Sequence, residues 1–277
     1  MFGWRGRVLR VDLTRGKLSE EALDPRVAKD FIGGRGLSIY YLLKELDPYC
    51  DPLGPDNMLI MAAGPLTGTG APTGARYMVT TKSPLSGATT CSNSGGQFPA
   101  EMKKAGFDMI ILQGKSPDPV YLWIDRGRAE LRPAKHLWGK TSYETEDALK
   151  AETDPNARVS CIGPAGERLV RFAAIMNEKH RAAGRSGVGA VMGSKKFKAV
   201  VVRGEDKIPL ADEEGFRKIN RRYQEKWREK TKDNPPPLRL HGTAVTVGIL
   251  QNYGVLPTRN FQGGTFEGWE RISGETL

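Results

Sequence analysis

One glycine-rich stretch, residues 64–96, constrains most strongly what this chain can fold into. It contains three prolines, yet its middle, residues 76–82 (RYMVTTK), has the alternating, β-branched character of a strand. Glycine permits positive φ and close approach of the backbone to a ligand, while proline fixes the turns. The stretch therefore predicts tightly turned β structure, and by itself it leaves open whether a ligand is bound.

The end of this stretch predicts an anion site. Residues 93–96 (NSGG) lead into residues 97–105, which have the pattern of a short helix ended by Gly106. A glycine turn at a helix N-terminus presents unpaired N–H groups and the positive end of the helix dipole. We expect a phosphate to be seated there, although a tightly turned antiparallel domain without a ligand explains the same residues.

Composition is that of an ordinary globular protein. The 277 residues are 39% hydrophobic and 27% charged, and length suggests one large domain or two. No apolar run reaches the roughly 18 residues that span a membrane. The N-terminus alternates like a strand and lacks the apolar segment of a signal peptide. We therefore expect a cytoplasmic protein.

The cysteines and histidines are few and scattered. Three of each occur, and no CxxC pair is present. This spacing argues against a structural zinc or an iron–sulfur cluster held by this chain alone. We interpret each cysteine as a buried or partly buried thiol and His180 as a packed or loop-anchoring residue.

The formal net charge of +10 raises the question of nucleic-acid binding. The basic residues are spread along the chain, and no RRM signature, zinc finger or helix-turn-helix pattern accompanies them. The charge pattern therefore favours an anionic cofactor or partner over nucleic acid.

A second glycine-rich region repeats the first. An apolar strand leads to Gly163-Pro164 as another leads to Gly64-Pro65, and residues 197–204 match residues 107–114 in register. The pattern predicts an internal duplication of about residues 59–114 and 159–204, with an insertion in the first copy. A coincidence of glycine turns is the alternative.

The duplication predicts where the two glycine loops lie. Asn93 precedes Phe107 by 14 residues and Ala182 precedes Phe197 by 15, so the loops hold equivalent places. Two like units related by a pseudo-twofold axis bring both loops to one surface. That surface suits a ligand with two similar, phosphate-bearing halves.

Beyond the duplicated region the character of the chain changes. Residues 212–232 predict a long charged helix with apolar residues on one face, a proline run follows, and residues 241–252 predict another helix. We expect a base domain over residues 1–210 and the beginning of a truncated helical domain over residues 211–277.

Several segments are similar to one enzyme family. They are AAGPLTGTGAPTGARY, KSPLSG, NSGG, IGPAGE and HRAAGRSGVGAVMGSK. The chain, from its start to about Asn260, resembles the N-terminal part of the aldehyde:ferredoxin oxidoreductases, tungsten enzymes with a bis-pterin cofactor. The resemblance implies an α+β fold with a duplicated base of two similar, mainly antiparallel sheet halves carrying short helices, followed by the start of a helical domain.

The resemblance also implies how the cofactor is held. In the family a magnesium ion bridges the two pterin phosphates, and matching the motifs places its backbone carbonyl ligands at Asn93 and Ala182. Oxygen ligands suit magnesium. The resemblance places Arg76 between the pterin and a neighbouring [4Fe–4S] cluster, whereas simple pairing of Arg76 with a carboxylate is the alternative.

The remaining cofactor contacts are expected in the same two loops. Arg181 and Arg185 are expected at phosphate or pterin edges, where a planar guanidinium with five donors fits. Ser94 either belongs to the cofactor turn or only caps the following helix, and Arg35 is expected to order its own loop. Four glycines would let the backbone approach the ligand closely: Gly95, Gly96, Gly184 and Gly187.

The resemblance places the chemistry itself outside these residues. The family's cluster cysteines, substrate pocket and acid–base residues belong to its later domains, so we assign no catalytic residue here and expect the isolated chain to be inactive. The intact enzyme would oxidise an aldehyde to a carboxylic acid and pass electrons through the cluster to ferredoxin or another electron-transfer protein. Tungsten and molybdenum are not distinguished, and a homo-oligomer is compatible with the sequence.

Two other functions are compatible with the same residues. The chain could be a stand-alone, non-catalytic pterin-binding or scaffold subunit that works with a separate partner. A nucleic-acid-binding protein is the weaker alternative and predicts affinity that falls steeply with salt.

Overall fold

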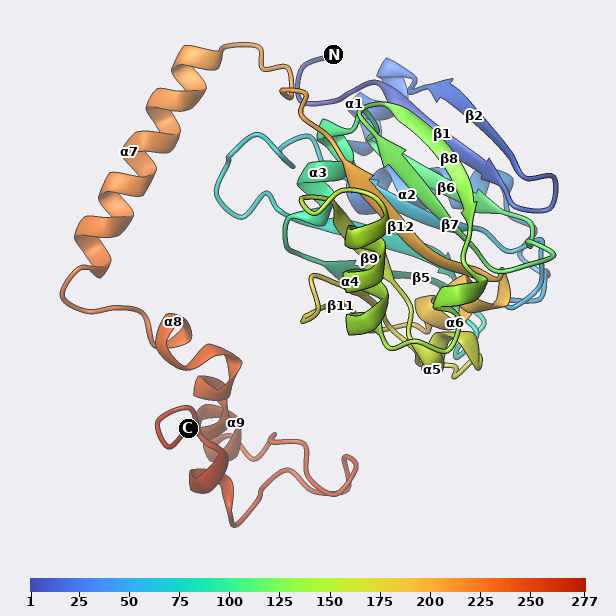
Figure 1. Ribbon diagram of the computed structural model, residues 1–277. Coiled ribbons are helices and arrows are strands. Elements are labelled where there is room, and N and C mark those ends of the chain that lie inside the picture. The colour runs from blue at the N-terminus through green and yellow to red at the C-terminus, as the bar shows by residue number, and fades with distance from the viewer. The chain divides into compact units, whose positions relative to one another are not determined.

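The computed structural model describes residues 1–277, which form two compact units, Met1–Glu213 and Glu214–Leu277. The first unit holds two six-stranded sheets with short helices (Figure 1). None of the helices combines the length and apolar character needed to cross a membrane.

The first sheet has the strand order β2-β1-β6-β3-β4-β5. Neighbouring strands are antiparallel except for β1 and β6, which are parallel. Its strands are β1 (Arg7–Asp12), β2 (Lys17–Ala22), β3 (Leu59–Ala63), β4 (Tyr77–Lys82), β5 (Thr89–Ser94) and β6 (Met109–Gln113).

The second sheet repeats this arrangement strand for strand. Its order, β8-β7-β12-β9-β10-β11, is that of the first sheet with each number raised by six, and only β7 and β12 are parallel. Its strands are β7 (Val120–Asp125), β8 (Arg128–Pro133), β9 (Arg158–Cys161), β10 (Ile175–Asn177), β11 (Arg181–Ala183) and β12 (Phe197–Arg203).

The predicted duplication and the α+β fold class are confirmed, and the repeated unit is larger than the sequence indicated. Each copy opens with a hairpin, β1–β2 in the first and β7–β8 in the second, that pairs with the last strand of its copy. The sequence repeat missed both hairpins because they contain none of the glycine turns on which the match was based.

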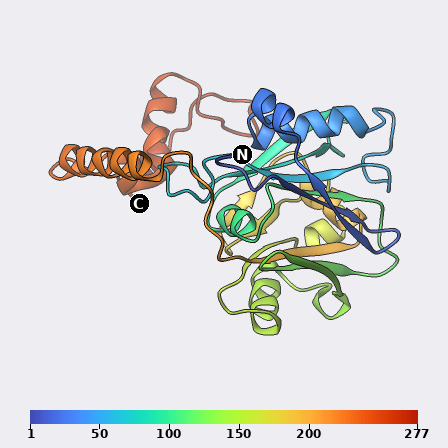
Figure 2. The same ribbon diagram turned by 90° about the horizontal axis from the view of Figure 1, so that it is seen from above.

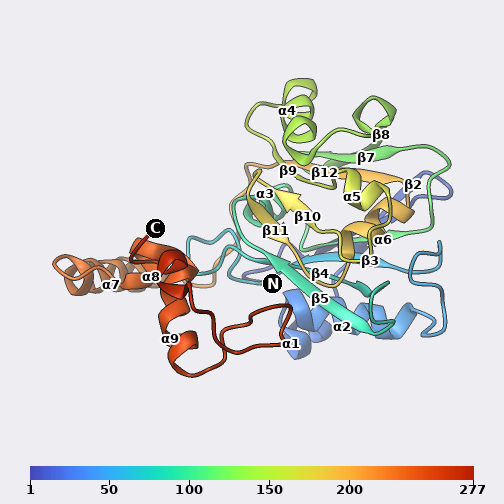
Figure 3. The ribbon, with the colours of Figure 1, turned by 90° about the horizontal axis from the view of Figure 1, so that it is seen from below.

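The helices lie in three layers. The short helices α3 (Phe98–Lys104) and α6 (Val188–Ser194) contribute to the core between the sheets, whereas α1 (Pro25–Phe31) and α2 (Gly34–Glu45) pack on the outer face of the first sheet. On the outer face of the second sheet lies α4 (Ser142–Glu152). Figures 2 and 3 show this order from α4 through the two sheets to α2.

Alternation along the strands supplies these three apolar layers. In β1, Leu9 and Val11 face the central core while Val8 faces α2. Successive side chains along a strand point to opposite faces of the sheet. Because both faces of these sheets are buried, the central strands contain nearly continuous apolar runs.

Local helix signals behave as their chemistry predicts. The carboxylate of Asp24 accepts the Arg26 N–H at 2.8 Å and caps α1. A capping box joins Thr141 and Glu144 at the start of α4. The connecting segments include a single turn, α5 (Pro164–Glu167), and a short 3₁₀ segment, η1 (Lys135–Leu137).

The second unit is helical. Its elements are α7 (Glu213–Thr231), α8 (Pro237–His241), η2 (Gly242–Val245), α9 (Thr246–Asn252) and η3 (Trp269–Ile272). The helix predicted over residues 241–252 is present as η2 followed directly by α9, and Gly242, with a positive φ of 60°, separates it from α8. On α7, the apolar face is largely exposed, with Ile219 at 70%, Tyr223 at 50% and Trp227 at 46%.

Candidate functional site

The two glycine loops meet where β5 and β11 lie side by side (Figure 3). Across this junction Asn177 accepts a hydrogen bond from the Ser94 hydroxyl at 2.6 Å and donates one to the Gly95 carbonyl at 2.9 Å. The loops therefore share one surface of the first unit, as the duplication predicted.

Asn93 and Ala182 occupy equivalent positions in the two sheets. Asn93 pairs with Met78 of β4, and Ala182 pairs with Met176 of β10. Because β4 and β5 correspond to β10 and β11, the two residues are counterparts in the duplicated fold. Ala182 is exposed and Asn93 half-buried. Their use as carbonyl ligands of magnesium stays a prediction.

Arg76 stands immediately before β4 with its side chain exposed. Its Nη1 donates to the Asn93 Oδ1 at 2.6 Å, and no carboxylate lies within ion-pair distance. An amide oxygen orients the guanidinium without neutralising it, so the positive charge remains available. A Cβ on Gly95 would lie 3.8 Å from the Arg76 Nε, an ordinary van der Waals distance, so the Arg76 side chain does not by itself require glycine there.

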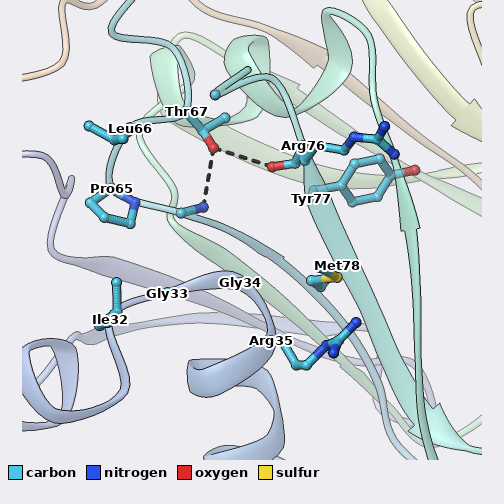
Figure 4. Close-up of a pocket in the computed structure, with 12 residues that line it drawn as sticks. Ile32, Gly33, Gly34, Arg35, Pro65, Leu66, Thr67, Arg76, Tyr77 and Met78 are labelled. Atoms are coloured by element: carbon cyan, nitrogen blue, oxygen red, sulfur yellow. Dashed lines mark hydrogen bonds between the residues drawn. The ribbon is translucent and has the colours of Figure 1, made fainter. Parts of the chain in front are cut away.

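A pocket of about 350 Å³ adjoins Arg76 (Figure 4). The Thr67 hydroxyl accepts the Gly64 N–H at 3.2 Å and donates to the Arg76 carbonyl at 3.2 Å, so the pocket loop holds the start of β4. The walls come from three segments: Ile32, Gly33, Gly34 and Arg35; Gly64, Pro65, Leu66 and Thr67; Gly74, Arg76, Tyr77 and Met78.

Arg35 belongs to this pocket, which sequence reasoning did not predict. Its guanidinium is exposed, and no hydrogen bond or ion pair holds it to its own loop. Packing orders that loop instead, because a Cβ on Gly33 would lie 2.9 Å from the Gly64 Cα. The available signal was an arginine flanked by glycines, which the structure places in the first turn of α2.

Lys103 is a second residue that sequence reasoning missed. Its side chain is fully buried, and its Nζ donates to the carbonyls of Gly3 at 2.5 Å, Gly64 at 2.9 Å and Pro65 at 3.1 Å. Burial lowers the pKa of Lys103 to about 8, although the Asp108 carboxylate 3.9 Å away acts in the opposite direction. The buried Lys103 ammonium therefore holds the pocket loop in place through its hydrogen bonds to the Gly64 and Pro65 carbonyls.

The prediction of a phosphate bound at the N-terminus of α3 is wrong for two backbone N–H groups there, those of Gln97 and Phe98, because a side chain already binds them. The Glu178 carboxylate accepts the N–H groups of Gln97 and of Phe98, the latter at 2.8 Å. The protein's own carboxylate therefore satisfies the helix dipole there. Ser94 does not cap the helix either, since its buried hydroxyl bonds to Asn177.

The second loop differs from the first in what its glycines do. Gly187 has a φ of +69°, and a Cβ there would lie 2.0 Å from the Arg171 carbonyl oxygen, so the fold itself requires glycine. Gly184 needs no positive φ, and its Cβ would touch only the Ala182 Cβ at 3.7 Å. Space above Gly184 is therefore open to a closely approaching ligand.

Several exposed arginines of the second loop and of the neighbouring pocket have no carboxylate partner. None of four exposed arginines has a carboxylate within ion-pair distance, whereas neighbouring Lys179 pairs with Asp147 at 2.8 Å. An anionic ligand fits such a donor set, because planar guanidinium groups bind phosphate in a bidentate manner. The four are Arg35, Arg76, Arg181 and Arg185. His180 is exposed beside them.

The cysteines do not form a site. Cys50 and Cys161 are buried, and burial raises the pKa of the Cys161 thiol to about 12. Cys91 contacts the Thr80 hydroxyl at 3.1 Å. No group of three or more His, Cys, Asp or Glu side chains that could hold a metal ion occurs in residues 1–277.

Two protein-family models match this chain and show the family to which it belongs. The family described as aldehyde ferredoxin oxidoreductase, N-terminal domain, matches residues 8–204, and the family's domains 2 and 3 match residues 218–277. The chain belongs to the aldehyde ferredoxin oxidoreductase family. The resemblance drawn from the glycine motifs is confirmed.

Individual relatives in this family are longer than the chain. It is 53% identical to the tungsten-containing aldehyde ferredoxin oxidoreductase of Pyrococcus abyssi and 52% identical to that of Thermococcus kodakarensis, and each comparison covers all of this chain and 46% of the relative. The chain thus spans about half the length of these relatives. A WOR-like subunit of an aliphatic sulfonate oxidoreductase from Pyrococcus furiosus is 39% identical over 83% of the chain.

The fold also matches a solved structure. The active-site complex BamBC of benzoyl coenzyme A reductase superimposes with a TM-score of 0.85 at 35% identity, covering 98% of this chain and 43% of that one. The match supports the duplicated architecture described above.

Proposed function

We propose that this chain is the cofactor-seating N-terminal part of a tungsten enzyme that oxidises an aldehyde to a carboxylic acid. The observation that carries the proposal is the junction of β5 and β11, where two equivalent loops and unpaired arginines meet on one surface. Residues 1–210 would form the base under the cofactor, and residues 211–277 would begin the next domain.

The residues at the junction fit a ligand with two phosphate-bearing halves, such as a bis-pterin. Arg181 and Arg185 present charges without carboxylate partners, and Gly184 leaves open space beside them. The backbone carbonyls of Asn93 and Ala182 would complete a magnesium site between the phosphates, since magnesium prefers oxygen ligands in octahedral geometry. When bound, the tungsten pterin supplies the two-electron chemistry, and the chain holds and orients it.

Arg76 would hold the pterin edge on the side where electrons leave. The Asn93 side chain and, through the backbone, Thr67 keep its guanidinium in place, so the charge would be pre-organised for a hydrogen-bonded ligand. A [4Fe–4S] cluster and ferredoxin would take the electrons onward. The cysteines that bind the cluster would lie outside these 277 residues.

The choice of aldehyde as substrate rests on the relatives that are 50–53% identical to the chain. The more distant matches bear the names of a sulfonate oxidoreductase and of benzoyl coenzyme A reductase. The shared base therefore supports a cofactor assignment more directly than a substrate.

The first experiment is the intact mass and metal content of the polypeptide purified from its native cells. We expect a species about twice the 30.5 kDa of this chain that contains tungsten and iron, because the chain covers 46% of its relatives. A 30.5 kDa species with neither metal would contradict the proposal.

A pair of variants then tests the anion site in the native enzyme. In the R181Q/R185Q double variant we expect tungsten retention to fall at least ~10-fold, because each hydrogen bond to a charged group contributes about 1.5–3 kcal/mol. The matched control is K179Q, since the Lys179 ammonium already forms an ion pair with the Asp147 carboxylate. Equal tungsten retention in both would remove Arg181 and Arg185 from the cofactor site.

A further inference from the structure

Each glycine turn at the junction is held by the opposite half of the duplicated fold. The turn at residues 94–97 belongs to the first half, yet its contacts come from Asn177 and Glu178 of the second. The Ser94 hydroxyl and the Gly95 carbonyl bond to Asn177, and the Gln97 N–H donates to Glu178.

The second turn is held in the reverse direction. The Ser92 hydroxyl accepts the Arg185 N–H at 3.1 Å, and the Ser83 hydroxyl donates to the Ser186 carbonyl at 3.0 Å. A further hydrogen bond joins the hydroxyls of Thr90 and Ser186. The bracing is therefore reciprocal.

The backbone is strained at Glu178, whose carboxylate bonds to the first turn, and at the residue that follows it. Glu178 and Lys179 both have positive φ, 50° and 62°, without being glycine. Such conformations persist only where surrounding contacts impose them, and each destabilises by on the order of 1–3 kcal/mol. A Cβ on Gly96 would lie 2.6 Å from the Glu178 Oε1, so the turn and the carboxylate are fitted closely to each other.

We infer that Asn177 and Glu178 are positioning residues that couple the two cofactor turns, so that the two seats for the ligand's halves form together as one unit. Neither side chain is placed against the ligand. The carboxylate fixes the backbone of the first turn, and the serines of the first half fix the second in return. This inference rests on the proposed function for its ligand, while the coupling itself concerns the protein alone.

The consequence is that loss of the hydrogen bonds that hold one turn also loosens the backbone of the other turn. If Glu178 is removed, the N–H groups of Gln97 and Phe98 lose their acceptor, and the junction with Asn177 loosens beside them. The strand β5, which carries Ser92 as well as Ser94, then no longer offers a fixed acceptor to Arg185.

The test is amide hydrogen exchange in the full polypeptide, compared among three variants. E178G removes the carboxylate and relieves the backbone strain at that position. K179G relieves the same strain one residue later and keeps the carboxylate, so it is the matched control. E178Q keeps an acceptor oxygen and should rescue in part.

In E178G we expect exchange to rise at least ~10-fold at residues 97–98, since one lost hydrogen bond to a charged group is equivalent to that factor or more, and to rise in residues 181–187 as well. In K179G both segments should stay within ~3-fold of the wild type, and in E178Q the rise should be smaller than in E178G because a neutral oxygen still accepts the two N–H groups. A rise confined to the first turn, or equal effects in E178G and K179G, would overturn the coupling.

Tungsten retention on dilution provides an independent readout. E178G should release tungsten faster than K179G, although neither residue is placed in contact with the cofactor; equal release would contradict the positioning role. If the wild-type protein carries no tungsten, the proposed function fails, whereas the exchange comparison still decides whether the turns are coupled.

Discussion

Replacing the buried lysine beneath the pocket, in the variant K103M, tests the electrostatics of the site. Lys103 is fully buried and bonded to three carbonyl oxygens, and burial lowers the pKa of its ammonium to about 8 from the ordinary 10.5. At 1.36 kcal/mol per pKa unit, the folded state bears a penalty of about 3 kcal/mol for keeping this group charged.

The sign of the pH effect follows from which state holds the proton. Below pH 8 both states are protonated at Lys103 and the full penalty applies. Between pH 8 and 10.5 the unfolded state still binds the proton while the folded state releases it, so the Lys103 contribution to stability rises with pH. From pH 7.5 to 9.5 this rise amounts to about 2 kcal/mol.

The assay is denaturant unfolding of the wild type and K103M at several pH values. Because methionine does not titrate, we expect the wild-type free energy of unfolding minus that of K103M to rise by about 2 kcal/mol from pH 7.5 to 9.5. K195M should behave alike, since burial also lowers the pKa of Lys195 to about 8. The exposed lysine variant K29M is the control, and a flat or falling difference for K103M would refute the reasoning.

Two further substitutions probe packing and charge burial in the same unit. E167Q leaves the fully buried ammonium of Lys198 without its carboxylate partner and should destabilise by about 3–5 kcal/mol, lowering Tm by roughly 6–20 °C, while E130Q in an exposed ion pair should cost less than about 1 kcal/mol. G187A should lower the free energy of unfolding by at least about 2 kcal/mol, because alanine at positive φ is strained and its Cβ would meet the Arg171 carbonyl. Thermal unfolding measures both, and a change under about 1 kcal/mol for either would contradict the packing described.

Much of the architecture follows from short-range patterns. The cap at Asp24, the capping box at Thr141 and the alternating strands are local features, and helices α3 and α7 begin within about two residues of their predicted starts. The glycine motifs were sufficient to predict the duplication and the family.

Other features could not be predicted from local pattern. The strand β10 is confined to Ile175–Asn177, because the segment before it turns twice. The hairpins β1–β2 and β7–β8 belong to the duplication through pairing with β6 and β12, strands far along the chain.

The sequence by itself determined the duplicated glycine loops, their equivalent placement and the excess of positive charge. Only the tertiary structure decided which polar groups satisfy one another. Glu178 takes the helix amides that sequence assigned to phosphate, Lys103 is buried under the pocket loop, and Arg35 stays unpaired at its wall. The physical reason is that a buried donor must find whatever acceptor the fold brings near, and here the acceptors lie about 40 and 80 residues away.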